Sequence, residues 1–538
     1  MRPEDPTGAV VQAFRLVHDI QAGLPGSADE LAALAATARE HDWGDVERAC
    51  LFGEAVRSWI DGDGRSAEPV EALLASAREA GDDVMLALGL ALRADHGFSG
   101  GALSRSALYD HDLARATVML EQTRARPCER ISAHTACAIA FGNRWLFELS
   151  HEQYAAALEI GRAEPKGSLD FLLAPILFNL AEEQVSWAAK LYELGDDHGV
   201  RTRLSSWNEF VAMAGAYPMS QAWRTELDAL GLVLASLAGH EAVERAAHLL
   251  GILAGSPGAE GRAGALLQLA VAIGHARHGR ERDVGGDPAG AVERAVGALS
   301  PAVHPFMYDL ALFLAAELEA RDGQGAGLRY ARRVVEEQWA KREAALMAMR
   351  AHVASVRLAS ERDLLSRHAR LDDLTGIANR RALEEFVSGL VRKGVAQCAV
   401  LLFDVDSFKE VNDVHGHLSG DRVLVQVAEV LRRGIRSSDL AVRLGGDEFA
   451  VVLGGADLDA ARERAEALVR AFEHERLEEI AGDLHLRVSA GVAVGEPAAI
   501  MQMWAAADAA LYEVKAAGGH GVRVAPDVRA TGRHRDAG

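Results

Sequence analysis

Four acidic residues in the last third of the chain have the types and spacing to do chemistry. Asp447 and Glu448 follow two glycines in RLGGDEFAVV, and Asp404 ends the apolar run CAVLLFD, with Asp406 two residues on. Glycine permits positive φ angles and a close approach of ligand to backbone, so we expect a tight bend from which both acidic side chains project. Carboxylates from a strand end and an adjacent bend suit hard cations such as Mg²⁺. Metal-assisted phosphoryl transfer is the hypothesis that follows.

An α/β domain is expected to position these side chains. Residues Cys398–Asp404 form a continuous apolar run, which is typical of a buried central strand. DLAVRL and FAVVL flank a four-residue Gly-Gly-Asp-Glu connection as a hairpin, and Leu486–Val494 is a further predicted strand. A helix is expected from about Leu418 to Arg433. The polar tail after about Val524 is expected to be disordered.

The rest of the chain is predicted to be helical. From about residue 8 to about residue 325 it is Ala/Leu-rich with helical periodicity, as in SADELAALAATAREHD from Ser27. Similar segments recur about every 35 to 45 residues, which favours a tetratricopeptide-type α-solenoid with degenerate repeats. The period is irregular, so a plain helical bundle stays open as the alternative.

A long helix is expected to connect the two regions. The stretch from Leu328 to Thr375 contains neither Gly nor Pro, and its apolar residues alternate at spacings of three and four. Such a stripe in a charged helix is usually buried against another helix. We expect a parallel dimer partner there, and packing back on the helical region is the alternative. The stripe is Val335, Trp339, Arg342, Leu346, Met349, Val353, Val356 and Ser360, with the arginine and serine fitting less well.

Composition limits the classes of function. The chain has 538 residues, 49% of them hydrophobic and 25% charged, as in soluble globular proteins. Its formal net charge of −21 argues against nucleic-acid binding and against anionic membrane surfaces. The four cysteines form no C-x-x-C pair, and we find neither a signal peptide nor the roughly 18 apolar residues of a membrane span. A cytoplasmic protein is expected.

Five ordered motifs give the C-terminal region a family resemblance. LTGIANRR, FDVDSFKEVNDVHGHLSGD, RSSD, GGDEF and ADAALYEVK occur in the order and at the spacing of the GGDEF family of diguanylate cyclases. The resemblance covers about Leu371 to Val524. It implies a ferredoxin-like, cyclase-type palm in which two GTP molecules, one per subunit of a homodimer, condense to cyclic di-GMP and two pyrophosphates. Mg²⁺ or Mn²⁺, two ions per active site, would be the cofactor.

The resemblance also implies roles for individual residues. Asp404, the Val405 carbonyl and Asp447 would hold metal, and Asp447 with Glu448 would form the catalytic acidic pair that activates the ribose 3′-hydroxyl. The substrate-binding set would be Lys409 and Lys515, with Asn412 and Asp421 reading guanine. For the last pair the chemistry agrees, because a carboxylate accepts from both N1–H and N2–H₂ of guanine, which adenine lacks.

A product-binding site is implied beside the bend. Arg436-Ser-Ser-Asp439 occupies the place of the family's R-x-x-D inhibitory site, which binds cyclic di-GMP and restrains the enzyme. An arginine fork suits phosphate or guanine, and aspartate suits guanine N–H groups. The alternative is an ordinary surface ion pair of Arg436 with Asp439.

One departure from the family pattern bears on activity. The family commonly continues its final Lys with two residues and then Gly-Arg-Asn, whereas here Gly519 occupies the place of an arginine that contacts the triphosphate. Loss of that contact is expected to weaken substrate binding by about 1–3 kcal/mol and to raise KM. His520 or Arg523 could substitute for it.

The combined prediction is a regulated signalling enzyme. Its parts are a helical sensor or interaction domain (residues 1–327), a helical or coiled-coil linker (328–370), a diguanylate cyclase domain (371–526) and a tail (527–538). GTP, cyclic di-GMP and a second copy of the chain are the expected partners, with a protein or peptide on the helical domain. The first alternative is a catalytically weak domain that senses cyclic di-GMP or GTP. The second is an adaptor whose helical region carries the main function.

Overall fold

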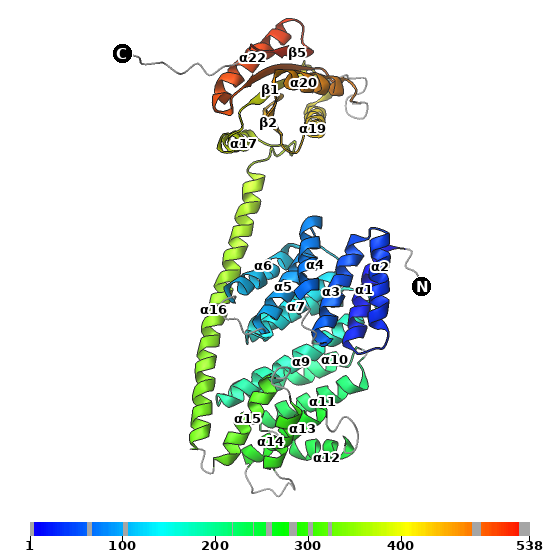
Figure 1. Ribbon diagram of the computed structural model, residues 1–538, viewed down its shortest axis with the longest axis vertical. Helices are drawn as coiled ribbons and strands as arrows, with labels where there is room; N and C mark the ends of the chain where they lie inside the picture. Colours follow the sequence, from blue (N-terminus) through cyan, green and yellow to red (C-terminus); the bar gives the residue numbers. More distant parts are fainter. Residues whose placement is uncertain are drawn as a thin grey trace, which may run out of the picture. The chain divides into compact units, whose positions relative to one another are not determined.

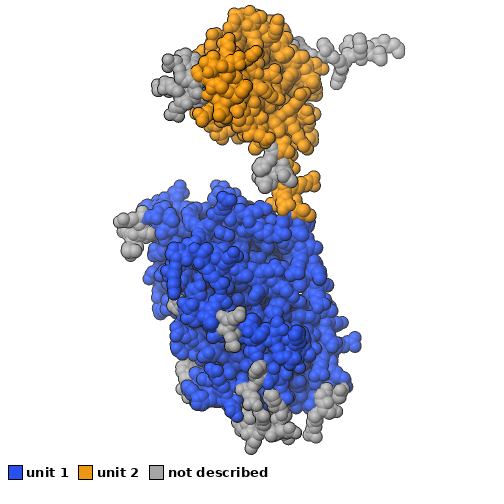
Figure 2. All heavy atoms as spheres, turned by 180° about the vertical axis from the view of Figure 1, so that it is seen from behind, with its two compact units in different colours: residues 1–357 blue, residues 358–538 orange. Residues whose placement is uncertain are grey.

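The structure, a computed structural model, describes residues 5–61, 67–99, 106–217, 219–239, 242–253, 261–278, 288–299, 305–320, 325–475 and 486–526. The chain divides into two compact units, Met1–Arg357 and Leu358–Gly538, coloured separately in Figure 2. The described part of the first unit is all-helical and the second is α/β, which confirms the predicted fold class.

Stacked helices make up the first unit (Figure 1). Each helix contacts its neighbour in sequence, and each odd-numbered helix from α1 to α13 also contacts the next odd-numbered helix. Helix α9 additionally contacts α1, so α1, α3, α5, α7 and α9 surround a common interior. Neighbour-to-neighbour stacking is the pattern of an α-solenoid, and the tetratricopeptide-type repeat itself stays a prediction. The helices are α1 (Pro6–Gln21), α2 (Ser27–Glu40), α3 (Gly44–Asp61), α4 (Ala67–Ala80), α5 (Asp83–Ser99), α6 (Ser106–Gln122), α7 (Pro127–Gly142), α8 (Phe147–Ala163), α9 (Asp170–Glu193), α10 (Asp197–Ala214), α11 (Gln221–Leu237), α12 (Val243–Leu253), α13 (Arg262–His278), α14 (Pro288–Ala298) and α15 (Pro305–Glu319).

The long helix α16 (Ala326–His368) packs its apolar stripe on the first unit. Leu346 and Met349 belong to the buried core of that unit, and Trp339 packs against it. Arg342, which is 6% exposed, donates its Nε–H to the Trp145 carbonyl at 2.8 Å. The structure thus buries this stripe on the first unit, as the alternative has it, and a parallel dimer partner for α16 stays a prediction. A heptad pattern shows that a face is buried, but it does not say which helix buries it.

A five-stranded sheet forms the centre of the second unit, in the order β2-β3-β1-β4-β5. Strand β1 lies between β3 and β4 and is antiparallel to both, while β5 is parallel to β4. The central strand predicted from CAVLLFD is thus confirmed. The strands are β1 (Cys398–Val405), β2 (Leu440–Gly445), β3 (Glu448–Gly454), β4 (Val488–Gly495) and β5 (Gly521–Val524).

Helices cover both faces of this sheet. Alternate residues of β1 enter two cores, with Leu401 and Phe403 under α19 and α20, and Val400 and Leu402 under α17 and α22. Helix α22 approaches β4 so closely that a Cβ on Gly491 would overlap the backbone of α22. The helices are α17 (Arg380–Arg392), α18 (Phe408–His415), α19 (His417–Arg433), α20 (Leu458–Glu473), η3 (Pro497–Ala499) and α22 (Ile500–Ala516).

Local predictions and structure differ in two details. The connection between β2 and β3 is tighter than the expected four residues, because Gly445 pairs with Glu448 and leaves only Gly446 and Asp447 between them. Strand β4 begins two residues later than predicted, at Val488. The predicted disordered tail, residues 527–538, lies outside the described residues. Among the described helices, none combines the length and the apolar character needed to cross a membrane.

Candidate active site

The pairing of β1 with β3 brings the acidic residues to one end of the sheet. Asp404 lies opposite Glu448 in the register, and the Val405 N–H donates to the Asp447 carbonyl at 3.4 Å. Gly446 has a φ of 55°, in the left-handed region that glycine adopts without strain. The bend therefore sets Asp447 beside the end of β1, as the sequence predicted for these residues.

Arg443 holds the bend in place. Its Nε and Nη2 donate to the Gly446 carbonyl at 3.1 and 2.9 Å, and its Nη1 donates to Asp372 Oδ1 at 3.0 Å. Burial opposes ionisation of Asp372, but hydrogen bonds from Thr375 and Arg443 outweigh it and lower the pKa of that carboxyl below its ordinary value. Sequence reasoning missed this clamp, because spacing along the chain does not indicate a contact between Arg443 and Asp372, 71 residues apart.

Lys515 and Asp404 form an ion pair at the centre of the site. Lys515 Nζ lies 2.6 Å from Asp404 Oδ1, and the Asp404 side chain is 10% exposed. Burial raises the pKa of Asp404, and the negative charges of Asp447 and Glu448 add to this, while the hydrogen bond from Lys515 lowers it. The carboxylates of Asp447 and Glu448 repel the buried carboxylate of Asp404. The Lys515 ammonium supplies the positive charge that offsets this repulsion.

The donor set fits a divalent cation bound together with substrate. Among the described residues there is no group of three or more His, Cys, Asp or Glu side chains that could hold a metal ion. Asp404, the Val405 carbonyl and Asp447 are oxygen donors, which Mg²⁺ accepts when waters and phosphates complete its shell. Asp406 is occupied differently, because it accepts from Ser489 Oγ at 2.7 Å and from the His520 N–H at 2.8 Å. It supports a loop and does not join the metal donors.

The predicted guanine-reading residues lie on two consecutive helices. Asn412 lies on α18, and its side chain packs directly over Gly420 on α19, where a Cβ would overlap it. Asp421 is the next residue of α19 and is exposed, as is Lys409 on the first turn of α18. Because residue 420 is a glycine, α18 and α19 lie close enough for the Asn412 amide and the Asp421 carboxylate to belong to one site.

The R-x-x-D segment forms a turn that lacks the Arg436–Asp439 ion pair expected under the alternative interpretation. Asp439 accepts backbone N–H groups from Arg436 at 3.2 Å and from Gly454 at 3.3 Å. The Arg436 side chain is exposed, and no ion pair to Asp439 is found among the described residues. The carboxylate therefore shapes the turn, and the guanidinium is presented to solvent.

Both expected substitutes for the missing arginine are paired with carboxylates of the same domain. His520 Nε2 pairs with Glu473 at 2.5 Å, and Arg523 Nε pairs with Glu513 at 2.7 Å. Gly519 has a φ of 74°, and a Cβ there would lie 3.0 Å from Asp406 Oδ1. The loop after α22 is closed around Asp406.

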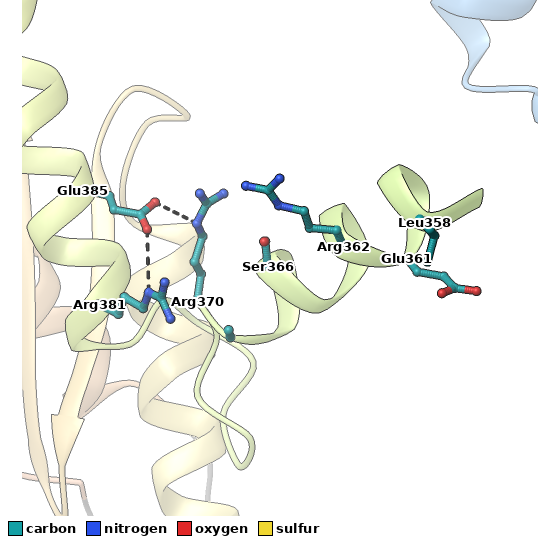
Figure 3. A pocket seen from close by; sticks show the side chains of 8 residues that line it. Leu358, Glu361, Arg362, Ser366, Arg370, Arg381 and Glu385 are labelled. Carbon is teal, nitrogen blue, oxygen red and sulfur yellow. Dashed lines mark ion pairs between the residues drawn. The ribbon is translucent and has the colours of Figure 1, made fainter. Parts of the chain in front are cut away.

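A pocket lies where α16 ends and α17 begins (Figure 3). Its volume is about 420 Å³. Glu385 on α17 lies 2.7 Å from Arg370 Nε and 3.8 Å from Arg381 Nε, while Arg362 extends from α16 toward the Arg370 side chain. These ion pairs connect the segment after α16 to the first helix of the α/β unit.

Comparisons with known proteins agree with the geometry. The family model described as "Diguanylate cyclase, GGDEF domain" matches residues 369–520. These residues are a GGDEF domain. Diguanylate cyclase DgcS of Shewanella oneidensis is 32% identical over 168 residues, which are 30% of this chain and 55% of the relative. Diguanylate cyclase DgcP of Pseudomonas aeruginosa is 36% identical over 180 residues, 31% of this chain and 26% of the relative.

A solved structure is also similar to the GGDEF domain. The coiled coil and GGDEF domain of DgcB from Caulobacter crescentus, in complex with c-di-GMP, is 29% identical, with 34% of this chain and 98% of that chain covered and a TM-score of 0.31. The chain spans about half of the length of DgcS and about a quarter of the length of DgcP. The helical unit lies outside the residues that the family model matches.

Proposed function

We propose that this protein is a diguanylate cyclase that condenses two GTP molecules to cyclic di-GMP and two pyrophosphates. The observation that carries the proposal is the convergence of Asp404, Asp447 and Lys515 within a GGDEF domain. Two adjacent carboxylates and an ammonium can hold a metal–triphosphate complex, which is what phosphoryl transfer requires. We propose a cytoplasmic location, where GTP is available.

The chain's own residues would perform three tasks in the reaction. Asp404, the Val405 carbonyl and Asp447 would hold Mg²⁺ or Mn²⁺, two ions per site, which supply charge stabilisation when bound. Asp447 and Glu448 would take the proton of the ribose 3′-hydroxyl. That oxygen then attacks the α-phosphorus of the other GTP, forming one P–O bond while the α–β bond breaks and pyrophosphate leaves. Lys409 and Lys515 would bind the phosphates.

Guanine selection is proposed for Asn412 and Asp421. The exposed carboxylate of Asp421 can accept both N–H groups of the guanine edge, and the Asn412 amide can serve the remaining edge. ATP would leave these groups unpaired, which is the basis for rejecting it.

The active site is proposed to form between two copies of the chain. Each domain holds one GTP, and the two 3′-hydroxyls must face the opposite α-phosphates, so pairing supplies proximity. Because the α16 stripe packs within its own chain, this pairing uses other surfaces. A partner that binds the helical unit would regulate the rate by changing how two GGDEF domains meet.

Product inhibition is proposed at Arg436 and Asp439. The exposed guanidinium of Arg436 is available to a phosphate or guanine, and Asp439 orders the turn that presents it. Arg436→Ala should leave the initial rate unchanged and raise the cyclic di-GMP concentration needed for half-inhibition at least tenfold. Equal inhibition of both proteins would contradict this site.

A second candidate is a GGDEF domain that binds nucleotide without turnover. The closed loop at Gly519 favours it, because His520 and Arg523 are engaged elsewhere and the usual arginine contact is missing. Purified full-length protein mixed with GTP and Mg²⁺ separates the two. A diguanylate cyclase releases cyclic di-GMP and pyrophosphate, whereas the binding protein retains GTP unchanged. With ATP as substrate, no product is expected.

A further inference from the structure

A second cavity lies inside the helical unit, far in sequence from the GGDEF domain. Its volume is about 140 Å³, and every residue that lines it comes from α1, α3, α5, α7 or α9. These are the helices that surround the common interior of the stack. Nothing in the proposed cyclase reaction uses this space.

The size of the cavity selects small ligands. An engineered protein cavity of about 150 Å³ binds benzene, whereas pockets for drug-sized or nucleotide ligands measure roughly 300–1,000 Å³. The 140 Å³ here therefore suits one or two fused rings and is well below the volume of a nucleotide pocket.

The lining is mostly apolar and aromatic. Phe14 and Phe52 contribute rings whose centroids lie 5.7 Å apart, and Trp59 lines the same space while 62% exposed. Pro175 on α9 also lines it and has no amide N–H to donate. Because its ring is exposed and also lines an apolar cavity, Trp59 offers a surface on which an aromatic ligand can stack.

The charged and ionisable residues of the lining determine which polar groups a ligand can carry. Among the described residues that line the cavity, the ionisable ones are His18 and Asp95, with no Lys or Arg. Burial lowers the pKa of His18, so its imidazole is neutral near pH 7. Asp95 accepts a hydrogen bond from Asn143 Nδ2 at 2.7 Å and also interacts electrostatically with Arg144, which is not among the lining residues. The lining therefore offers acceptors to a hydrogen-bond donor and neither lysine nor arginine to an anion.

We infer that the cavity between α1, α3, α5, α7 and α9 binds a small aromatic molecule of one or two rings that carries an N–H donor and no negative charge. This would make the helical unit a receptor for a small molecule, with the GGDEF domain on the same chain.

Three compounds that share one ring system test the inference. Isothermal titration of full-length protein with indole, tryptamine and indole-3-acetate separates ring binding from charge. Indole and tryptamine should bind with one site per chain, and indole-3-acetate at least tenfold more weakly. No binding of indole and tryptamine at millimolar concentration, or equal binding of the acetate, would overturn the inference. GTP is absent, so the result does not depend on the cyclase proposal.

Substitutions of lining residues test whether indole binds in this cavity. Ala136→Phe fills the cavity and should abolish binding of indole, whereas Ala72→Phe, the same change at an exposed position of α4, should not. Circular dichroism checks that both variants fold. Asp95→Asn keeps an acceptor for Asn143 and should reduce the preference for tryptamine over indole-3-acetate at least fivefold. Unchanged indole binding by folded Ala136→Phe, or an unchanged preference in Asp95→Asn, would place the ligand elsewhere.

Discussion

Lys515 Nζ lies 2.6 Å from Asp404 Oδ1, so the ammonium of α22 neutralises the carboxylate at the end of β1. Both residues have a proposed role with substrate, one with phosphate and one with metal. In the structure these two side chains bind each other. If Asp404 holds metal as proposed, the ion pair would compete with the metal, and substrate phosphates are expected to draw the lysine away from Asp404.

Removing the ammonium tests this competition. Lys515→Met should bind Mn²⁺ up to about tenfold more tightly than wild type in the absence of nucleotide, a change of about 1.4 kcal/mol. It should nevertheless turn over GTP more slowly, because it lacks the phosphate contact. Calorimetric titration with Mn²⁺ measures the first effect. Lys515→Arg, which keeps a positive charge near Asp404, is the control. Weaker Mn²⁺ binding by Lys515→Met would show that no competition exists.

A change at Gly420 tests the guanine site without altering any group that would touch the base. A Cβ there overlaps the Asn412 side chain, so Gly420→Ala should displace the amide and raise KM for GTP about tenfold with a smaller effect on kcat. Gly389→Ala on α17 is the matched control, because the atom nearest to the added Cβ lies 3.9 Å from it. This change should stabilise the protein by about 0.5–1 kcal/mol. The same KM in both variants would argue against Asn412 in base recognition.

The α16 stripe gives a prediction about stability. Leu346 is 7% exposed in the core of the helical unit, whereas its neighbour Met347 is 68% exposed. Leu346→Ala should destabilise that unit by about 2–5 kcal/mol and leave the dimer dissociation constant unchanged. Met347→Ala should change stability by less than about 0.5 kcal/mol. Denaturant unfolding and sedimentation measure both quantities. Loss of the dimer in a folded Leu346→Ala protein would restore the stripe as a dimer seam.

Glu183 predicts how stability depends on pH. Burial raises its pKa to about 8, although the hydrogen bond from Ser150 lowers it. The folded protein therefore holds this proton more tightly than the unfolded chain does. Its contribution to stability is complete below the ordinary pKa of 4.5 and is lost as pH rises toward about 8, by at most about 1.4 kcal/mol per pH unit.

The variant Glu183→Gln isolates that contribution. The free energy of unfolding of wild type, relative to that of the variant, should be highest at pH 5 and should decrease as the pH rises to about 8. Denaturant unfolding at several pH values measures it, and Glu159→Gln on the exposed face of α8 is the control. A difference that stays constant from pH 5 to pH 9 would mean that Glu183 is ionised throughout.

The predictable parts of the fold are local in sequence. The apolar run before Asp404 and the glycine pair before Asp447 each indicate one element, and the register of β1 with β3 brings them together as expected. The helical character of the first unit was equally readable from its periodicity. Boundaries moved by about two residues, as at Val488, where strand pairing and not composition decides the start.

The unpredictable parts depend on distant partners. The α16 stripe could pair with any apolar face, and only the folded chain selects the helical unit. Arg443 reaches Asp372, 71 residues away, and Asp406 accepts from His520, 114 residues away. Spacing along the sequence does not indicate such contacts. From the sequence alone, Asp406 is therefore a fourth acidic candidate for the active site, and only its hydrogen bonds with Ser489 and His520 exclude it.

The most direct test compares wild type with Asp447→Asn under identical conditions. Wild-type protein with GTP and Mg²⁺ should form cyclic di-GMP, and Asp447→Asn should form it at least about 100-fold more slowly because it loses both a metal donor and part of the acidic pair. Asp459→Asn, an exposed change on α20, should match wild type. Equal rates in wild type and Asp447→Asn, or no product from folded wild type, would contradict the account.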